Sequence, residues 1–152
     1  ENQLTAEYIT IHTENKALKM IDMKNLAFII SQEDSGRFNQ IKGKNMQGYF
    51  RDNELNMIDV KGNGQTIYYA RDKGKIQGVN TCKCSDIKIF LKERKVNRIK
   101  FINKPDAVYY PVSKFPPAES KLEDFRWFGE YRPMDRYDVF RWDQPRNEVY
   151  IP

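Results

Sequence analysis

The sequence predicts an all-β protein built from antiparallel hairpins that repeat along the chain. Three observations predict it: a motif that occurs three times, apolar residues that alternate with polar ones, and turn-forming residues at short intervals. Alternation with a period of two gives each strand one apolar face, which is typical of half-buried antiparallel strands. Repetition at this length indicates units that bury their apolar faces against their neighbours, so we expect a stacked, elongated scaffold.

The repeated motif begins at residues 18–24, with the sequence LKMIDMK, and returns at residues 55–61 as LNMIDVK, with five of seven positions identical. A third copy at 96–101, VNRIKF, keeps the spacing of the apolar residues. The second copy starts 37 residues after the first, and the third starts 41 residues after the second. The longer offset holds without a gap from Met46 to Tyr69 and preserves which side each residue faces. A one-residue slip would turn the apolar side outward, so this agreement predicts a buried inward face.

Turn-forming segments separate the alternating runs at 33–36, 51–53, 62–64, 71–74 and 103–106. Their Gly, Asn, Asp and Pro residues adopt positive φ or form turns through their side chains. We therefore expect residues 1–111 to form about ten short strands joined by hairpins.

The character of the chain changes after Pro111, and residues 112–152 form a C-terminal segment with no alternation. Pro at the start, and Leu122 and Phe125 three residues apart, predict one short helix over 117–127. We expect this segment to cap the array or to lead into a further domain. Its irregular tail is aromatic and basic, and its aromatic residues are Phe125, Trp127, Phe128, Tyr131, Tyr137, Phe140, Trp142 and Tyr150.

Composition places few limits on the partner. The chain of 152 residues is long enough for one domain with its own core. Its 26 Lys and Arg outnumber its 21 Asp and Glu, and the net charge of +5 modestly favours anionic partners. The longest apolar run, residues 26–30, has the length of a strand rather than that of a membrane span.

No catalytic centre and no cofactor are expected. The chain has a single histidine, His12, and lacks a nucleophile motif such as G-x-S-x-G. His12 alternates with the apolar residues of its strand, so it is expected on the exposed side, opposite to the apolar face. A catalytic pair of carboxylates is not excluded, because the strands can bring Asp22, Asp59 or Glu93 together. Asp22 and Asp59 occupy the same position in two copies of the motif, which fits solvent-facing positions of repeated strands better.

Cys82 and Cys84 are the only two cysteines. On a strand their side chains point to the same side, with Cα atoms about 6.5 Å apart, near the outer limit for an unstrained disulfide. We expect two buried thiols that behave as small hydrophobic residues. A metal site is not expected, since only His12 remains as a nitrogen ligand.

Two hairpin units carry a resemblance to a known family: residues 41–69, IKGKNMQGYFRDNELNMIDVKGNGQTIYY, and residues 76–101, IQGVNTCKCSDIKIFLKERKVNRIKF. They resemble the OstA-like family, which includes the LptA-type periplasmic proteins of lipopolysaccharide transport. In that family a strand with an I-x-G start is followed by a turn and an L-x-x-I-x-V strand. The segment at 115–133, FPPAESKLEDFRWFGEYRP, is similar to the one that follows such repeats in OstA-like proteins of Bacteroidetes-type bacteria. The resemblance covers residues 4–134, while the C-x-C and the long aromatic tail depart from a minimal LptA-type domain.

The resemblance implies a folded-over antiparallel β-jellyroll, or β-taco, whose two walls enclose an apolar groove for the acyl chains of lipopolysaccharide. It also implies end-to-end association through exposed edge strands. The residues expected to line this groove, on the inward side by parity, are Ile9, Ile11, Ile21, Met23, Phe28, Ile30, Met46, Phe50, Ile58, Val60, Ile67, Ile87, Ile89, Leu91, Ile99, Phe101 and Val108.

The same residues fit a closed core, and that alternative stays open because most apolar residues are simply buried. A comparison of free energies indicates that the apolar interior of the sheet, rather than its charged surface, would supply the affinity for a lipid. A buried methylene contributes about 0.8 kcal/mol, so a twelve-carbon chain gains about 10 kcal/mol, whereas an exposed ion pair contributes about 0–1 kcal/mol. Cationic side chains would then only steer the anionic headgroup. The candidates for this anion contact are Lys42, Lys44, Arg94, Lys95, Arg98 and Lys100.

We therefore expect a periplasmic protein of a Gram-negative bacterium that carries or scaffolds lipopolysaccharide or another acylated glycolipid. Edge-to-edge self-association or other transport components are the expected protein partners. One alternative is a structural repeat module that assembles through its edges without lipid. Another is a nucleic-acid-binding β domain, suggested by the charge and by 13% aromatic residues but without any recognised motif, so no nucleic acid is expected. A carbohydrate-binding role would use the outward residues Tyr8, Tyr68 and Tyr109.

Overall fold

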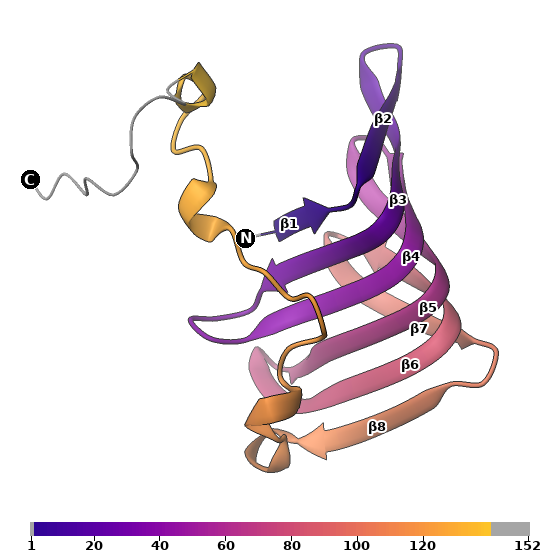
Figure 1. Cartoon of the computed structure of the whole chain (residues 1–152), viewed down its shortest axis with the longest axis vertical. Helices are drawn as coiled ribbons and strands as arrows, with labels where there is room; N and C mark the ends of the chain where they lie inside the picture. Colours follow the sequence, from indigo (N-terminus) through magenta and orange to yellow (C-terminus); the bar gives the residue numbers. More distant parts are fainter. Residues whose placement is uncertain (1, 141–152) are drawn as a thin grey trace, which may run out of the picture.

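The computed structural model describes residues 2–140 and shows one antiparallel sheet of eight strands (Figure 1). The prediction of an all-β antiparallel fold is confirmed. The main path of the sheet runs β1-β3-β4-β5-β6-β7, while β2 also pairs with β3 and β8 with β6. The strands are β1 (Asn2–Thr5), β2 (Tyr8–Glu14), β3 (Ala17–Gln32), β4 (Phe38–Arg51), β5 (Glu54–Asp72), β6 (Lys75–Lys92), β7 (Lys95–Ile102) and β8 (Asp106–Pro111).

The three copies of the repeated motif lie on every second strand, namely β3, β5 and β7. Directly opposite residues of an antiparallel sheet share a face, so the register defines rows that cross the sheet. One row contains Ile21, Gly48, Ile58, Ile89 and Ile99. The neighbouring row on the same face contains Met23, Met46, Val60, Ile87 and Phe101. The offset of 41 residues is therefore the length of two strands and their turns.

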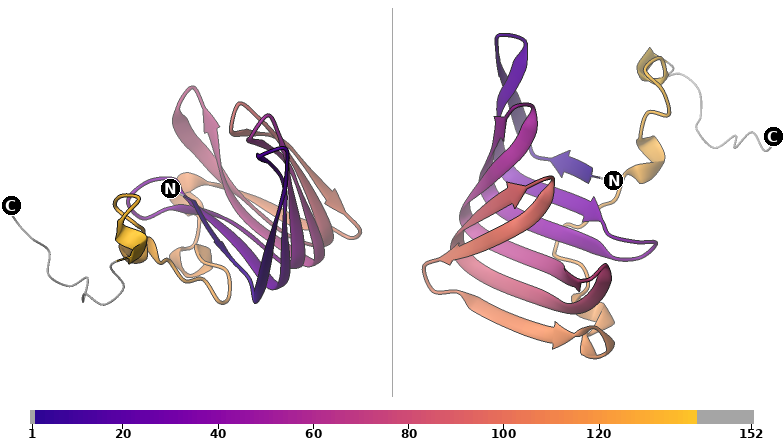
Figure 2. Two further views of the ribbon diagram at one scale, coloured as in Figure 1. Left: turned by 90° about the horizontal axis from the view of Figure 1, so that it is seen from above. Right: turned by 180° about the vertical axis from the view of Figure 1, so that it is seen from behind.

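The sheet bends along a line of register shifts that crosses its central strands. This line consists of one register shift from each of the pairs β3–β4, β4–β5 and β5–β6, at residues 24–27, 42–45 and 61–64 respectively. On β3 the bulge contains Asn25 and Leu26, with φ of 59° and 51°. Because a bulge bends its own strand, adjacent bulges bend the sheet as a whole (Figure 2). The sheet is nevertheless neither closed nor strongly curled.

The bend divides the sheet into two arms that share their long strands. The β7 arm holds β2, β7 and the segments 17–24, 45–51, 54–61 and 86–92. The β8 arm holds β1, β8 and the segments 27–32, 38–43, 64–72 and 75–84.

The predicted turn at 62–64 is wrong, because these residues lie inside β5 at the bend. Gly62, with a φ of 77°, and Asn63, with a φ of 52°, form the bulge there, and the Gly62 N–H donates to Asp86 Oδ1 at 3.0 Å. The strand therefore continues through the turn-like residues. The expectation of about ten short strands is wrong for the same reason: the structure has eight, and β5 alone spans 19 residues.

Buried apolar residues form two clusters on different sides of the sheet. The larger cluster lies on the β7 arm and at the bend, on the face of the two rows described above, and it consists of Met23, Ala27, Met46, Ile58, Val60, Ile87 and Ile89. The smaller one consists of Ile67, Tyr69 and Val79 on the β8 arm, packed against Phe115 and Leu122.

The predicted helix over 117–127 is wrong: the described chain contains only 3-10 turns after the last strand. Leu122 N–H donates to the side chain of Gln40 instead of to a helical carbonyl, and Asp124 has a φ of 65°, outside helical geometry. Trp142 and Tyr150 of the predicted tail lie outside the described residues. The turns are η1 (Val112–Lys114), η2 (Pro117–Glu119), η3 (Gly129–Tyr131) and η4 (Asp138–Phe140).

Residues 112–128, which we call the strap, instead run across the β8 arm from β8 toward β1 (Figures 1 and 2). The amide of Gln40 holds the strap at two points: Nε2 donates to Ser120 O and Oε1 accepts from Leu122 N–H, both at 2.8 Å. Gln3 makes the same pair of bonds farther along, at 2.7 Å each, with Arg126 O and Phe128 N–H. Each glutamine side chain thus donates one hydrogen bond to the strap backbone and accepts one from it, as a peptide group of a neighbouring β-strand would.

Candidate binding groove

A groove of about 520 Å³ lies between the two arms of the bent sheet. Both walls are largely apolar, in contrast to the charged outer face of the β7 arm. The β7 arm contributes Leu55, Ile58, Ile89, Leu91, Val96 and Ile99. The β8 arm contributes Leu4, Ile29, Ile41, Thr66 and Tyr68.

Two glycines allow the backbone to pack closely at the bend beneath the groove. A Cβ atom on Gly43 would overlap the Cγ1 methyl of Val60, and one on Gly64 would lie 2.8 Å from Cγ1 of Ile87. Neither position has room for a larger residue unless the core side chain moves. The bend also frees backbone donors, one of which is satisfied when Asn45 Oδ1 accepts from the N–H of residue 25 at 3.1 Å. The curvature that forms the groove therefore depends on specific small and polar residues.

Charged residues line the open edges of the groove, at the ends of the arms farthest from the bend. On the β8 arm, Arg71 pairs with Glu33. On the β7 arm, Arg94 pairs with Glu54 at 3.2 Å, and Lys95 lies beside it. The apolar walls are therefore bordered by cationic side chains at both edges.

Most of the predicted groove residues lie on the groove side of the β7 arm, in the two rows of the sheet or, for Leu91, next to them. These are Ile21, Met23, Met46, Ile58, Val60, Ile87, Ile89, Leu91, Ile99 and Phe101, and Phe50 lies opposite Leu55 on the same side. Ile9 and Ile11 continue the rows onto β2, where they are 45% and 61% exposed.

Four predicted groove residues, Phe28, Ile30, Ile67 and Val108, point to the opposite face of the β8 arm by register, although Ile67 also borders the groove. Ile30 is opposite Gln40, which is itself opposite Ile67, and Gln40 binds the strap. Phe28 is opposite Lys42, whose Nζ donates to the strap carbonyl of residue 123 at 2.9 Å. Val108 is in the row of Ile67. Phe28, Ile30 and Ile67 face the strap because β3 and β5 keep their alternation through the bend. Met23 and Ile29 both lie on the groove side of β3, as Val60 and Thr66 do on β5, so residues of the other parity point to the opposite face.

The groove also contains apolar residues that are absent from the predicted set. Ile29 and Ile41 face each other across β3 and β4 on the groove side, next to the residues that face the strap. Leu55 and Val96 begin the second and third copies of the repeated motif. The apolar run at 26–30 could have predicted this arrangement, since a continuous apolar run indicates a strand that is buried on both faces.

The structure brings Arg94 and Lys95 to the groove but places the other anion-contact candidates elsewhere. Arg98 lies on the outer face of the β7 arm, with its guanidinium 4.5 Å from the centre of the Phe90 ring. Lys100 is on the same outer face, opposite Lys88.

The remaining two candidates lie at the bend and under the strap. Lys44 is exposed beside Gly62 at the bend. Lys42 forms an ion pair of 2.8 Å with Asp124 of the strap. The hydrogen bond from Lys42 and its charge lower the pKa of the Asp124 carboxyl below its ordinary value. Lys42 is therefore occupied in holding the strap.

The two cysteines are free thiols on the groove side of the β8 arm, since Cys82 is opposite Thr66 and Cys84 is opposite Gly64. Cys82 is buried, whereas Cys84 is half-buried and its Sγ donates to the carbonyl of Asp86 at 3.2 Å. Burial, reinforced by the neighbouring Cys84, raises the pKa of Cys82 to about 12. The Cys82 thiol is therefore protonated at neutral pH.

Asp22 and Asp59 lie in one row on the outer face of the β7 arm, separated by Gln47, so they do not form an adjacent carboxylate pair. Asp59 instead contacts Lys88 at 3.8 Å. His12 is exposed on β2.

Within the described part of the chain, no three His, Cys, Asp or Glu side chains gather closely enough to hold a metal ion. No helix among residues 2–140 has the length and apolar character needed to cross a membrane. Comparisons with protein-family models, with curated proteins and with solved structures found no match to this chain.

Proposed function

We propose that this protein binds the acyl chains of lipopolysaccharide, or of another acylated glycolipid, in the groove between the two arms. The arms then act as the walls of a folded-over β-jellyroll that is open on one side. The protein carries or scaffolds its ligand in the periplasm of a Gram-negative bacterium, on the way to the outer membrane. No covalent step and no cofactor are needed.

The single observation that carries the proposal is a concave surface with apolar side chains on both walls and cations at its edges. Sites for small amphipathic ligands combine an apolar lining with a few polar groups at defined places. The groove places its aliphatic side chains, such as Ile41 and Ile99, between the bend and the charged edges. A ligand with a hydrocarbon tail and an anionic head matches both parts.

The energetics assign different roles to the two parts. Each methylene taken from water into the groove contributes about 0.8 kcal/mol, so the tail supplies the affinity. Arg71 and Arg94 already hold exposed ion pairs with Glu33 and Glu54. An anionic head that exchanges with these carboxylates gains about 0–1 kcal/mol at each exposed site, so the edges orient the ligand.

Native mass spectrometry of protein purified from a Gram-negative host tests the proposal. Wild-type protein should carry a co-purified glycolipid. Ile99→Glu puts a charge on the groove wall at a half-buried position, and this variant should lose the adduct. Lys100→Glu, at the next residue on the outer face of β7, should retain it. Absence of any adduct from wild type, or its loss from both variants while the β-rich circular dichroism persists, would contradict lipid binding in the groove.

A second candidate function, assembly through edge strands without lipid, is favoured by β2. All seven residues of this strand are exposed, and within the described chain it pairs with β3 alone. An unpaired edge with free backbone donors and acceptors is a template for another strand. Sedimentation at rising protein concentration tests this function. Filaments that form without lipid and disappear on Thr10→Pro would support it.

A further inference from the structure

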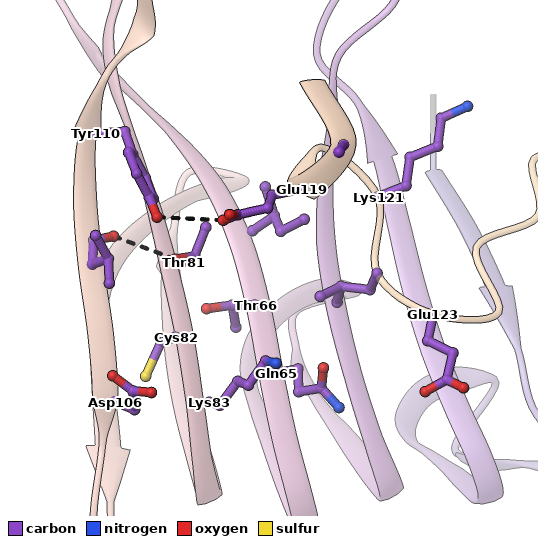
Figure 3. A pocket seen from close by; sticks show the side chains of 14 residues that line it. Gln65, Thr66, Thr81, Cys82, Lys83, Asp106, Tyr110, Glu119, Lys121 and Glu123 are labelled. Atoms are coloured by element: carbon purple, nitrogen blue, oxygen red, sulfur yellow. Dashed lines mark hydrogen bonds between the residues drawn. The ribbon is translucent and has the colours of Figure 1, made fainter. Parts of the chain in front are cut away.

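A second cavity, of about 540 Å³, lies on the other side of the β8 arm, between the sheet and the strap (Figure 3). We call it the strap wedge. Its walls are formed by residues of β5, β6 and β8 and by residues 118, 119 and 121–123 of the strap. The strap wedge and the groove lie on opposite faces of the β8 arm, and Thr66 and Ile67 border both cavities.

One wall of the strap wedge is a row of polar side chains. Gln65 of β5, Lys83 of β6 and Asp106 of β8 are directly opposite one another and therefore share a face. They line the cavity together (Figure 3). None of the three side chains makes a hydrogen bond or ion pair within the part of the chain that the structure describes. Their amide, ammonium and carboxylate groups thus offer donors and acceptors to a ligand.

The neighbouring row is more apolar. It consists of Ile67, Thr81 and Val108, and Leu122 of the strap faces the same cavity. Val108 is 43% exposed there, although it is an aliphatic residue in the sheet. A ligand in the strap wedge therefore meets an apolar strip beside a polar row. At one end Tyr110 Oη donates to the carboxylate of Glu119 at 3.3 Å and ties β8 to the strap (Figure 3).

The charges of the strap wedge nearly balance. Two lysines, Lys83 and Lys121, stand against three carboxylates, Asp106, Glu119 and Glu123. A site for a phosphate would need an excess of cations, and a site for a metal ion would need at least three clustered ligands, which the described residues do not provide. The balance of charge favours a neutral ligand that both donates and accepts hydrogen bonds.

We propose that the strap wedge binds a neutral saccharide unit. The hydroxyl groups of a pyranose donate to carboxylates and accept from ammonium and amide groups, which matches the row of Gln65, Lys83 and Asp106. The ring also has a C–H face, which matches the strip formed by Ile67 and Val108. The saccharide can be free or can be the glycan part of a glycolipid, because the recognised groups are the same.

An NMR titration of the full chain with maltose, lactose and N-acetylglucosamine tests the proposal. At least one sugar should give saturable shifts at the amides of Thr81, Lys83 and Asp106. Asp106→Ala and Lys83→Ala should each weaken its binding about tenfold or more, because each removes charge-assisted hydrogen bonds. Both side chains are exposed and unbonded, so the variants should fold. Asp72→Ala and Lys100→Ala, which alter exposed residues outside the wedge, are the matched controls and should bind like wild type.

A second titration, with delipidated lipopolysaccharide glycan and with the intact glycolipid, distinguishes the two sources. Binding of the free glycan at the wedge assigns a soluble saccharide, and wedge shifts with the intact glycolipid alone assign the glycolipid headgroup. Ile99→Glu should leave the sugar titration unchanged, so failure of the lipid groove is separable from failure of the wedge. Absence of saturable shifts with every probe, equal affinity in all four variants, or binding of inorganic phosphate in preference to sugars would overturn the proposal.

Discussion

Ile21 and Ile58 occupy one row of the sheet, with only Gly48 of β4 between them. They hold the same position in the first two copies of the repeated motif, and Ile99, from the third copy, closes the row beyond Ile89. The repeat in the sequence is therefore a repeat in space: each copy adds one aliphatic side chain to the same wall of the groove. The sequence of each copy therefore determines which side chains face the groove as well as where a strand forms.

The glycines at the bend should not tolerate even a methyl group. Gly64→Ala places a Cβ atom 2.8 Å from Cγ1 of Ile87, so we expect a loss of about 1–3 kcal/mol in the free energy of unfolding. Gly36→Ala is the matched control, because nothing lies within 4 Å of its added Cβ atom. Urea unfolding monitored by circular dichroism measures both. Equal stabilities would show that the bend does not require the close approach.

The strap should depend on the amide of Gln40. Gln40→Ala removes the bonds to Ser120 O and Leu122 N–H and leaves both backbone groups without a side-chain partner, at an expected loss of about 2–3 kcal/mol. Limited proteolysis should then cleave within the strap, at Lys121, before it cleaves the sheet. Gln65→Ala, a variant of an unbonded glutamine, should be cleaved like wild type. A trypsin pattern unchanged by Gln40→Ala would contradict this role.

The Cys82 thiol should resist alkylation in the folded protein. Its pKa of about 12, against an ordinary value of 9.0, lowers the thiolate population about a thousandfold. In a Cys84→Ala background, iodoacetamide at pH 8 should modify Cys82 only after urea is added, as mass spectrometry can measure. The unfolded chain releases this proton first, so stability should fall as the pH rises from about 9 toward 12. Equal rates in native and unfolded protein would contradict the burial of this thiol.

Asp124 should titrate below its ordinary pKa of 3.8, because Lys42 donates to the carboxylate and carries the opposite charge. A folded-state pKa below the unfolded value stabilises the strap above pH 3.8, and this contribution is lost as the pH falls through the folded value. A carbon-detected NMR titration measures the midpoint. Lys42→Met should raise it toward 3.8; a midpoint that does not move would show that the ion pair is absent in solution.

The repeat and the alternation were sufficient to predict the antiparallel sheet, because both reflect the pleat of strands that have one buried face. They could not predict the bend. Gly62 and Gly64 have the composition of a turn, and only the pairing of β5 with both neighbours shows that the strand continues through them. The expected turn at 62–64 separated Val60 from Ile67, but β5 keeps its alternation through the bend, so the Ile67 side chain packs against Leu122 of the strap.

The strap was predicted as a helix because Leu122 and Phe125 are three residues apart. In the structure they pack on different neighbours: Leu122 lies against the Ile67 cluster, and the Phe125 ring lies 5.2 Å from that of Phe38. These contacts join residues far apart in the sequence, as does the bond between Gln40 and Leu122, which are 82 positions apart. Spacing within a short segment carries no information about these partners.

Site-specific photocrosslinking at two adjacent residues of β7 measures whether a glycolipid occupies the groove in the cell. A photoreactive phenylalanine analogue replaces Ile99, on the groove wall, or Lys100, on the outer face, and the protein is irradiated in a Gram-negative host. We expect a glycolipid adduct from position 99 and none from position 100. Adducts from both positions, from position 100 alone, or from neither would contradict a lipid-binding groove between the arms.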